Sequence, residues 1–284
     1  MTSFESSPRS FGERLSAIFA DTGHLCVGID PHAYLLNEWG LADDASSLRE
    51  FGLRVVEASV GSVGIVKPQV AFFERHGSAG YAALETVISA ARSAGLLVIA
   101  DAKRGDVGST VEAYGQSWLT PGSPLESDAM TISAFQGLGS IDAPHELALA
   151  TGKGLFVLSA TSNPESLSVQ GAVLPEGASV SASILAGVDD WNRAEGAGLG
   201  STGAVIGATV DFAAFGIAES PLAQTPILAP GLGHQGARFS DVGAIYGAAA
   251  ANVIVSASRS ILSAGHAGLK AAITAQAAKI RAAL

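Results

Sequence analysis

The chain has very little sulfur chemistry available, because Cys26 is its only cysteine among 284 residues. A disulfide needs two cysteines, and zinc sites built on thiolates also need more than one. The six histidines are scattered without the spacing of metal ligands. The sequence therefore excludes an internal disulfide and a thiolate zinc site, and we expect no bound metal.

Long apolar runs and clusters of positive charge are also missing. No run reaches the roughly 18 uncharged residues of a membrane span, and residues 1–15 lack the apolar segment of a signal peptide. We therefore expect a cytoplasmic protein with no membrane partner. Lys and Arg number 16 against 26 Asp and Glu, and they form no basic patch, which disfavours a nucleic-acid partner. An anionic small-molecule substrate would need a local positive site.

Apolar residues make up 48% of the chain, and eight short, largely apolar segments recur along it, separated by Ala-rich amphipathic stretches such as 46–60, 78–94 and 239–250. Segments of this length, rich in β-branched residues, are typical of strands buried on both faces. Alternation with helices indicates parallel pairing, and eight such units fit a closed (β/α)₈ barrel. The predicted strands are Leu25–Ile29, Gly64–Val66, Leu96–Ala100, Ala129–Ser133, Leu155–Leu158, Ala204–Ala208, Pro226–Ala229 and Asn252–Val255.

A doubly wound sheet is the alternative architecture. It is disfavoured because Cys26–Asp30 runs straight into Pro31, with no Gly-rich dinucleotide-binding turn. No linker divides the chain, so we expect one barrel domain over residues 1–284. Within it we expect a mobile segment at 1–8, a helix near 11–20 that closes the bottom of the barrel, a final helix at 262–284, and loops at 116–128, 170–177 and 196–203.

Charged residues gather where the first three predicted strands end. Asp30 follows the first strand, Lys67 ends the second, and Asp101, Lys103 and Asp106 follow the third. In such barrels chemistry lies at the carboxyl ends of the strands, and buried charges need partners. Asp101 and Lys103 are two apart, so both should point to the same side. We interpret the set as a catalytic charge array; ordinary ion pairs at the rim are the alternative.

A second candidate site follows strands seven and eight, where such barrels often bind phosphate. Gly231, Gly233 and Gly236 allow a close approach of backbone amides to an oxyanion. Arg259 offers a guanidinium for bidentate contact, and the side-chain amide of Gln235 is a further donor. A Gly-rich turn with a rim arginine is the structural alternative. Both sites on one mouth would suit a phosphorylated substrate.

With these residues in view, the sequence resembles the orotidine 5′-monophosphate decarboxylases. The segment Asp101-Ala-Lys103-Arg-Gly-Asp106 matches the D-x-K-x-x-D motif of that family, and its surroundings look like the longer-chain bacterial branch. The ordered combination of motifs is more specific than the D-x-K-x-x-D core alone. The other matching segments are Val27–Pro31, Val66–Pro68, Thr161–Pro164, Ala229–Gly233 and Ser258–Ser260.

The resemblance implies a cofactor-free decarboxylation of orotidine 5′-monophosphate to uridine 5′-monophosphate and CO₂ in pyrimidine biosynthesis. Lys67, Asp101, Lys103 and Asp106 would form the charged network, with Lys103 stabilising and then protonating the carbanion at C6. The sequence carries no motif for pyridoxal phosphate, thiamine or flavin. The protein itself would therefore supply the stabilisation, through fixed charge in a dry site.

The resemblance also implies substrate contacts and a homodimer. Asp30 and Lys67 would hold ribose hydroxyls, Ser162 would bind the pyrimidine amide, and Gln235 and Arg259 would bind the phosphate under a lid at 232–239. Asp106 and Thr110 would reach the active site of the other subunit. Shorter-chain relatives tend to carry Ile-Pro in place of residues 107–108, Val-Gly here, so we expect a looser turn there.

Three other functions compete with this interpretation. A metal-dependent phosphosugar decarboxylase of the 3-keto-gulonate 6-phosphate type carries an acidic residue where Lys67 stands, and a lysine would repel the cation. A Schiff-base aldolase needs a lysine of depressed pKa, whereas neighbouring carboxylates favour the charged form. A non-catalytic phosphometabolite-binding barrel would not need the Asp101–Lys103–Asp106 array.

Overall fold

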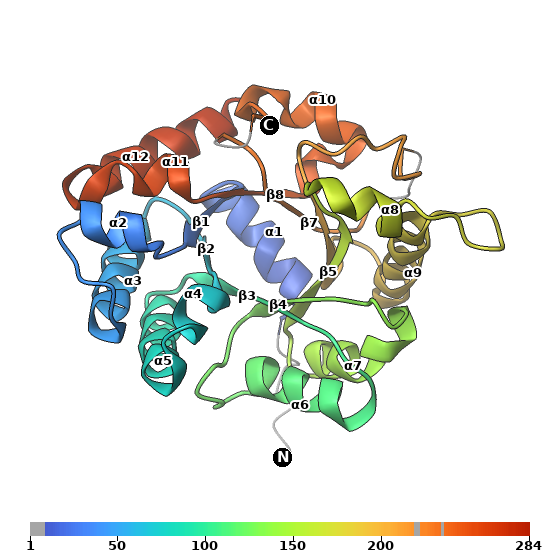
Figure 1. The fold of residues 1–284 in the computed structure, drawn as a ribbon. Helices are drawn as coiled ribbons and strands as arrows, with labels where there is room; N and C mark the ends of the chain where they lie inside the picture. Colours follow the sequence, from blue (N-terminus) through green and yellow to red (C-terminus); the bar gives the residue numbers. More distant parts are fainter. Residues whose placement is uncertain (1–8, 219–221, 234–235) are drawn as a thin grey trace, which may run out of the picture.

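The computed structural model describes residues 9–218, 222–233 and 236–284, which form a closed barrel of eight parallel strands surrounded by helices (Figure 1). The strands follow one another in chain order, and β8 pairs with β1 to close the barrel. The predicted architecture is confirmed, while the expectation for residues 1–8 lies outside the described residues. The strands are β1 (Leu25–Ile29), β2 (Ile65–Pro68), β3 (Leu97–Arg104), β4 (Ala129–Ile132), β5 (Gly154–Ala160), β6 (Thr202–Ile206), β7 (Ile227–Ala229) and β8 (Val253–Ala257).

Helices connect successive strands on the outside of the barrel, except between β6 and β7, where the described residues contain no helix. They are α2 (Ala33–Glu38), α3 (Ala45–Ser59), α4 (Val70–Glu74), α5 (Gly77–Ser93), α6 (Gly108–Leu119), α7 (Asp142–Ala150), α8 (Leu167–Gln170), α9 (Val180–Glu195), α10 (Val242–Tyr246), α11 (Arg259–Leu262) and α12 (Gly265–Arg281), with 3₁₀ turns η1 (Leu138–Ile141), η2 (Pro164–Ser166), η3 (Phe239–Asp241) and η4 (Gly247–Asn252). Among the helices described, none has the length and apolar character to cross a membrane.

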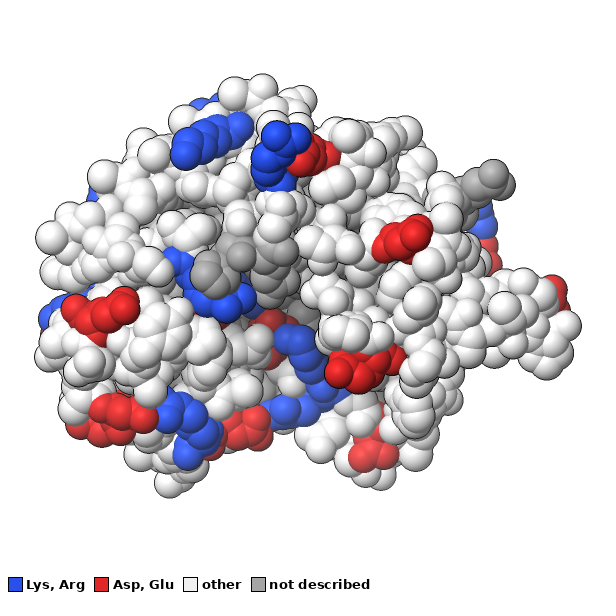
Figure 2. All heavy atoms as spheres, turned by 45° about the horizontal axis from the view of Figure 1, so that its top comes forward, with Lys and Arg blue, Asp and Glu red and all other residues white. Residues whose placement is uncertain are grey.

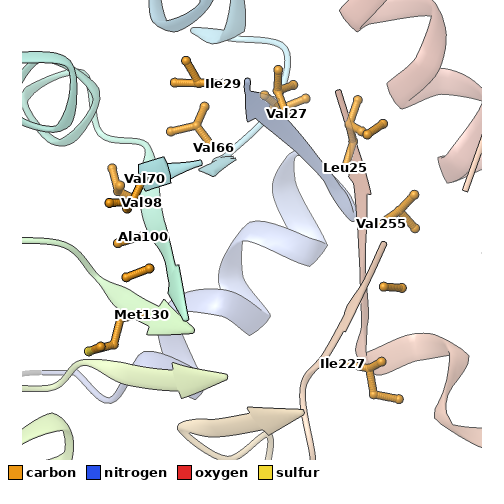
Figure 3. Packing of buried hydrophobic residues seen from close by; sticks show 14 of the residues in the cluster. Leu25, Val27, Ile29, Val66, Val70, Val98, Ala100, Met130, Ile227 and Val255 are labelled. Carbon is orange, nitrogen blue, oxygen red and sulfur yellow. The ribbon is translucent and has the colours of Figure 1, made fainter. Parts of the chain in front are cut away.

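The strands are buried on both faces, which explains their nearly continuous apolar sequences. Outward-facing residues such as Val27, Val66 and Met130 pack against the surrounding helices (Figure 3). Alternate residues, including Ile65 and Ile99, fill the interior of the barrel. Complete burial of a side chain of this size contributes about 1.5–3 kcal/mol, so the two layers together hold the barrel closed.

The helix α1 (Phe11–Asp21) plugs the end of the barrel at which the strands begin. Ser10 and Glu13 form a reciprocal capping box at its first turn, which satisfies amides that a helix start otherwise leaves unpaired. Phe11 and Leu15 are fully buried in the interior cluster, and the Phe11 ring packs edge-on against Phe156 with centroids 5.8 Å apart. The plug closes this end, so ligands reach the interior from the other.

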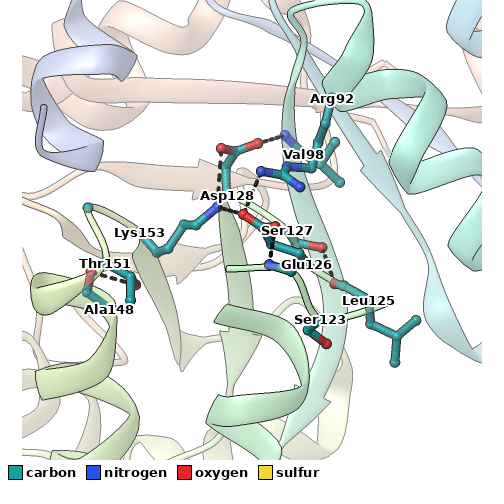
Figure 4. Close-up of polar contacts among 12 residues, drawn as sticks. Arg92, Val98, Ser123, Leu125, Glu126, Ser127, Asp128, Ala148, Thr151 and Lys153 are labelled. Carbon is teal, nitrogen blue, oxygen red and sulfur yellow. Dashed lines mark hydrogen bonds and ion pairs between the residues drawn. The ribbon is translucent and has the colours of Figure 1, made fainter. Parts of the chain in front are cut away.

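An ion network fixes the start of β4 and β5 at the plugged end (Figure 4). The buried Lys153 Nζ lies 2.7 Å from Glu126 Oε1 and 3.9 Å from Asp128 Oδ1. Arg92 contacts the same Glu126 oxygen at 2.5 Å, and Arg14 of α1 contacts Asp128 at 2.6 Å. Burial alone would raise the pKa of Glu126, but its bonds to Lys153 and other donors bring that pKa below its usual value.

Several predicted boundaries are wrong. The predicted loop 116–128 overlaps α6, which continues to Leu119. The strand predicted at 204–208 begins and ends two residues earlier, so Gly203 of the predicted 196–203 loop lies inside β6, where its missing side chain makes room for the Phe156 ring. The helix predicted over 239–250 is broken at Gly247, whose φ of 53° is left-handed. The final helix, predicted over 262–284, is α12, which begins only at Gly265 and ends at Arg281.

Candidate active site

A pocket of about 310 Å³ opens at the carboxyl ends of the strands, where the predicted site residues were expected. Interior positions recur at every second residue of a strand. In β3, Ile99 of the apolar interior is followed by Asp101, and in β2, Ile65 is followed by Lys67. The alternation that places apolar side chains in the core therefore also places charged side chains at the end of the core that faces the pocket. Figure 2 shows Lys, Arg, Asp and Glu side chains gathered around the hollow in the middle of the displayed face.

Asp101 is the centre of a charge array formed with two lysines. Its Oδ2 lies 2.7 Å from Lys67 Nζ, and its Oδ1 lies 2.5 Å from Lys103 Nζ. Burial would lower the pKa of Lys67, but the attraction of Asp101 and Asp30 raises it above its usual value. Burial would likewise raise the pKa of Asp101, and the two ammonium groups hold it well below the normal range. Lys67, Asp101 and Lys103 of the predicted array thus form one connected set of charges, and Asp106 is not part of it.

Two uncharged residues complete the surroundings of Asp101, and the sequence analysis missed both. Gln69 Nε2 donates to Oδ2 at 2.8 Å, and the Thr131 hydroxyl donates to Oδ1 at 2.9 Å. Each lies at an interior position, two residues after Lys67 and after Ala129 respectively. The two-residue alternation would have found Thr131 within the fourth predicted strand, and Gln69 if it had been extended beyond the end of the second. The carboxylate accepts four hydrogen bonds, which compensates for its removal from water.

Lys103 does not continue a regular strand, contrary to the simple alternation that the sequence suggested. Its φ is 47°, it is the only non-glycine residue with positive φ in the described part of the chain, and the pairing of β3 with β4 shifts register between Ala100 and Arg104. Such conformations are strained in non-glycine residues and occur at functional sites. The Lys103 amide donates to Thr131 Oγ1 at 2.9 Å. Asp101 and Lys103 therefore meet through an irregular backbone.

Asp30 lines the same pocket, next to Lys67. Its Oδ1 atom is buried, and within the described residues no donor reaches it. Buried carboxylate oxygens are normally hydrogen-bonded, so this oxygen is suited to a hydroxyl group of a ligand. The absence of a side chain at Gly28 lets Ser258 and Asp30 pack beside it, since a Cβ there would lie 1.9 Å from Ser258 Oγ and 3.3 Å from Asp30 Oδ1.

The same pocket also holds the residues of the candidate phosphate site. Arg259 begins α11 directly after β8, and Ser162 follows β5; both line the pocket. Gly231 also lines it, with a φ of 98° that favours glycine. Gln235 and part of the predicted lid at 232–239 lie outside the described residues, while the flanks of that segment are joined by a bridge between Leu232 and Ala237.

Comparison with known proteins assigns the chain to a family. The model of the orotidine 5′-phosphate decarboxylase / HUMPS family matches residues 23–273, most of the chain. The chain belongs to this family. Orotidine 5′-phosphate decarboxylase of Streptomyces coelicolor is 50% identical over 253 residues, which cover 89% of each chain. The enzyme of that name from a Nocardioides species is 52% identical over 256 residues, covering 89% of this chain and 91% of the relative.

Solved structures agree with this assignment. A chain described as the orotidine 5′-phosphate decarboxylase of Streptomyces avermitilis superimposes with a TM-score of 0.93 and 47% identity, over 100% of this chain and 99% of that one. The OMP decarboxylase of Leishmania donovani gives a TM-score of 0.76 at 28% identity, over 96% and 98% of the two chains. The resemblance to the orotidine 5′-phosphate decarboxylase family is thus confirmed, and with it the expected class of enzyme, a carboxy-lyase.

Two of the residues that the family resemblance implicates do not reach this pocket. Asp106 is half-buried beyond β3, where its Oδ1 accepts the amide proton of Val107 at 2.8 Å, and Thr110 is exposed on the first turn of α6. Neither lines the pocket of its own chain. Gly108 takes a φ of 57°, so glycine meets a defined backbone requirement in the turn that we expected to be looser.

Proposed function

We propose that this pocket binds orotidine 5′-monophosphate and removes its C6 carboxylate as CO₂, leaving uridine 5′-monophosphate in pyrimidine biosynthesis. The presence of the Lys67–Asp101–Lys103 array and Arg259 in the lining of one pocket is the observation that carries the proposal. Three cationic and two anionic side chains line the pocket, an excess of one positive charge in a chain of net charge −10. The pocket is thus suited to an anionic ligand, although the protein as a whole is acidic.

In the proposed reaction the bond between C6 and the carboxylate breaks, and its electron pair stays on C6 as CO₂ leaves. The Lys103 ammonium group, held beside that carbon, stabilises the developing negative charge and then transfers a proton to it. Solvent returns a proton to the lysine. Fixed charges of this kind need no reorganisation at the moment of reaction and are usually the largest catalytic contribution. Asp101, beside the departing carboxylate, would disfavour the bound substrate relative to the transition state.

The rest of the pocket is assigned to binding. Asp30 and Lys67 hold ribose hydroxyls, in agreement with the buried Asp30 oxygen that no donor from the described residues reaches. Ser162 contacts the pyrimidine amide, and Arg259 binds the phosphate together with Gln235. Binding energy from the phosphate, which is remote from the reacting carbon, can position the substrate for reaction.

We further propose that the active enzyme is a homodimer in which Asp106 and Thr110 complete the site of the partner subunit. In the single chain the Lys103 side chain is 46% exposed, which is too open for a water-excluding site. Val107 and Phe135 are 53% and 80% exposed. In sequence they come shortly after Arg104 and Ser133, whose backbones are hydrogen-bonded to each other. Exposed apolar residues of this size beside an open site favour an interface there.

The family also contains the HUMPS branch, so phosphosugar chemistry is the second candidate function. The Lys67 ammonium occupies one side of Asp101 at 2.7 Å, and a divalent cation at that oxygen would meet its repulsion. The deciding experiment mixes EDTA-treated protein with orotidine 5′-monophosphate and follows the loss of orotate absorbance. Rapid conversion supports the proposed function. If folded protein gives none, the proposal is wrong, and phosphosugar substrates with Mg²⁺ are tested next.

A further inference from the structure

Thr131 is a buried threonine on β4, in a strand whose other members are apolar. We propose that Thr131 is a positioning residue that fixes Lys103 for the decarboxylation, an inference that rests on the proposed function. Its single hydroxyl group links the backbone of Lys103 to the carboxylate of Asp101. Neither the family motif nor the charge pattern of the sequence points to it.

The contacts form a closed ring. The amide of Lys103 donates to Thr131 Oγ1 at 2.9 Å, and that hydroxyl donates to Asp101 Oδ1, also at 2.9 Å. The same Oδ1 atom accepts the Lys103 ammonium at 2.5 Å. Both the backbone and the side-chain end of Lys103 are therefore anchored to one carboxylate oxygen, and the hydroxyl is the link between them.

The ring explains how Lys103 keeps a left-handed backbone with φ of 47°. A non-glycine residue persists in that conformation only where the surroundings enforce it. A hydroxyl can accept the amide proton and donate its own proton at the same time. Because threonine is β-branched, it has few side-chain rotamers, and its buried hydroxyl stays aligned with both partners.

Loss of this hydroxyl should affect catalysis more than binding. Asp101 would keep Lys67 and Gln69 as donors, so the charge array would survive. The backbone of Lys103 would lose its acceptor and relax away from the left-handed conformation, carrying the ammonium group with it. A displacement of about 1 Å in a reacting group costs about 100-fold in rate.

The test compares Thr131→Val, which keeps the shape and removes the hydroxyl, with Thr131→Ser, which keeps the hydroxyl. Thr202→Val is the matched control, a buried threonine at the start of β6, outside the pocket. We expect Thr131→Val to lower kcat about 100-fold. The Kd for uridine 5′-monophosphate should change less than about threefold, Thr131→Ser should recover most of kcat, and Thr202→Val should keep kcat within about twofold.

Thermal unfolding of each variant shows whether it folds, and if Thr131→Val does not, Thr131→Ala is compared with Thr131→Ser in its place. The proposal is overturned if the valine variant keeps the kcat of the unmodified enzyme, if serine is as damaging as valine, or if the loss appears only in the Kd. Failure of the unmodified protein to decarboxylate orotidine 5′-monophosphate would instead refute the proposed function. The two failures are therefore distinguishable.

Discussion

The ammonium group of Lys103 lies 2.5 Å from the carboxylate of Asp101, in an ion pair made by protein groups alone. Asp101 is held on its other sides by Lys67, Gln69 and Thr131. Neither charge needs to be assembled by the substrate, so a carboxylate entering the pocket meets both at fixed positions. This preorganisation is the physical basis of the proposed catalysis.

Replacement of Lys103 by alanine should abolish turnover and leave the fold intact. The variant loses both the cation that stabilises the C6 carbanion and the proton donor, so kcat should fall by at least about 10⁴-fold. Asp101 keeps three of its four donors, which is why the barrel should still fold. The assay is the loss of orotate absorbance, with circular dichroism as the check on folding. Activity near that of the unmodified enzyme would refute the assignment of Lys103.

Replacement of Arg259 by alanine should mainly weaken the binding of phosphorylated ligands. A charge-assisted hydrogen bond contributes about 1.5–3 kcal/mol, so the Kd for uridine 5′-monophosphate should rise roughly 10- to 100-fold, while uridine affinity stays the same. Isothermal titration measures both. Arg54→Ala is the matched control, because Arg54 of α3 pairs with Glu50 outside this pocket and outside the predicted lid. Equal weakening in both variants, or none, would remove Arg259 from the phosphate site.

The barrel was predictable from the sequence because buried parallel strands leave a strong apolar signal. Lys67, Asp101 and Lys103 were predictable for a related reason, since charges at the end of an apolar strand stand out against it. The signal fails where the backbone departs from regular geometry. The residue types around Lys103 do not predict its left-handed φ, which depends on a hydrogen bond to a different strand.

Uncharged members of the site were harder to find for the same physical reason. Thr131 and Gln69 act through single hydrogen bonds to Asp101, and in sequence they look like ordinary strand or loop residues. Asp106 and Thr110 are a different case. Their proposed partner is another subunit, so a single chain contains the residues without the contacts that would define their roles.

Replacement of Gly28 by alanine should distort the mouth of the pocket. The new Cβ would lie 1.9 Å from Ser258 Oγ and 2.9 Å from Ser258 Cβ, so the segment leading to Arg259 must shift. Overpacking of this kind costs about 1–3 kcal/mol of stability, and we expect kcat/KM to fall about 10-fold or more. The double variant Gly28→Ala/Ser258→Gly removes the clash and should recover part of both losses. No recovery would mean that Gly28 acts in another way.

Replacement of Lys153 by methionine should destabilise the protein without affecting turnover. Glu126 and Asp128 would lose their shared buried cation, at a cost of about 3 kcal/mol at pH 7. The pKa of Glu126 is lowered in the folded protein, so its stabilising effect is present above the usual carboxyl range near pH ~4.3 and is lost as the pH falls through the folded-state value. The stability difference between the two proteins should therefore shrink on acidification.

Urea unfolding at pH 7, 4 and 3 measures that difference. Arg54→Met is the control, because the Arg54–Glu50 pair is more exposed and should contribute less than about 1 kcal/mol. A difference that stays constant or grows as the pH falls would contradict the assignment of the buried network. So would a loss of kcat in Lys153→Met, since this network lies at the plugged end of the barrel, away from the pocket.

Mixed dimers should regain activity if Asp106 completes the site of the partner subunit. Lys103→Ala and Asp106→Asn chains, each inactive alone, would form heterodimers in which one site combines the intact Lys103 of one chain with the intact Asp106 of the other. With random pairing in a two-fold dimer, about a quarter of all sites are intact. Co-expression of the two variants with different tags, followed by the decarboxylation assay, measures the recovery.

Lys103→Ala mixed with Lys67→Ala is the matched control, because both of those residues line the pocket of their own chain and no intact site can form. Recovery confined to the first mixture supports a shared site, whereas equal inactivity of both mixtures would place Asp106 in the site of its own chain or outside the chemistry.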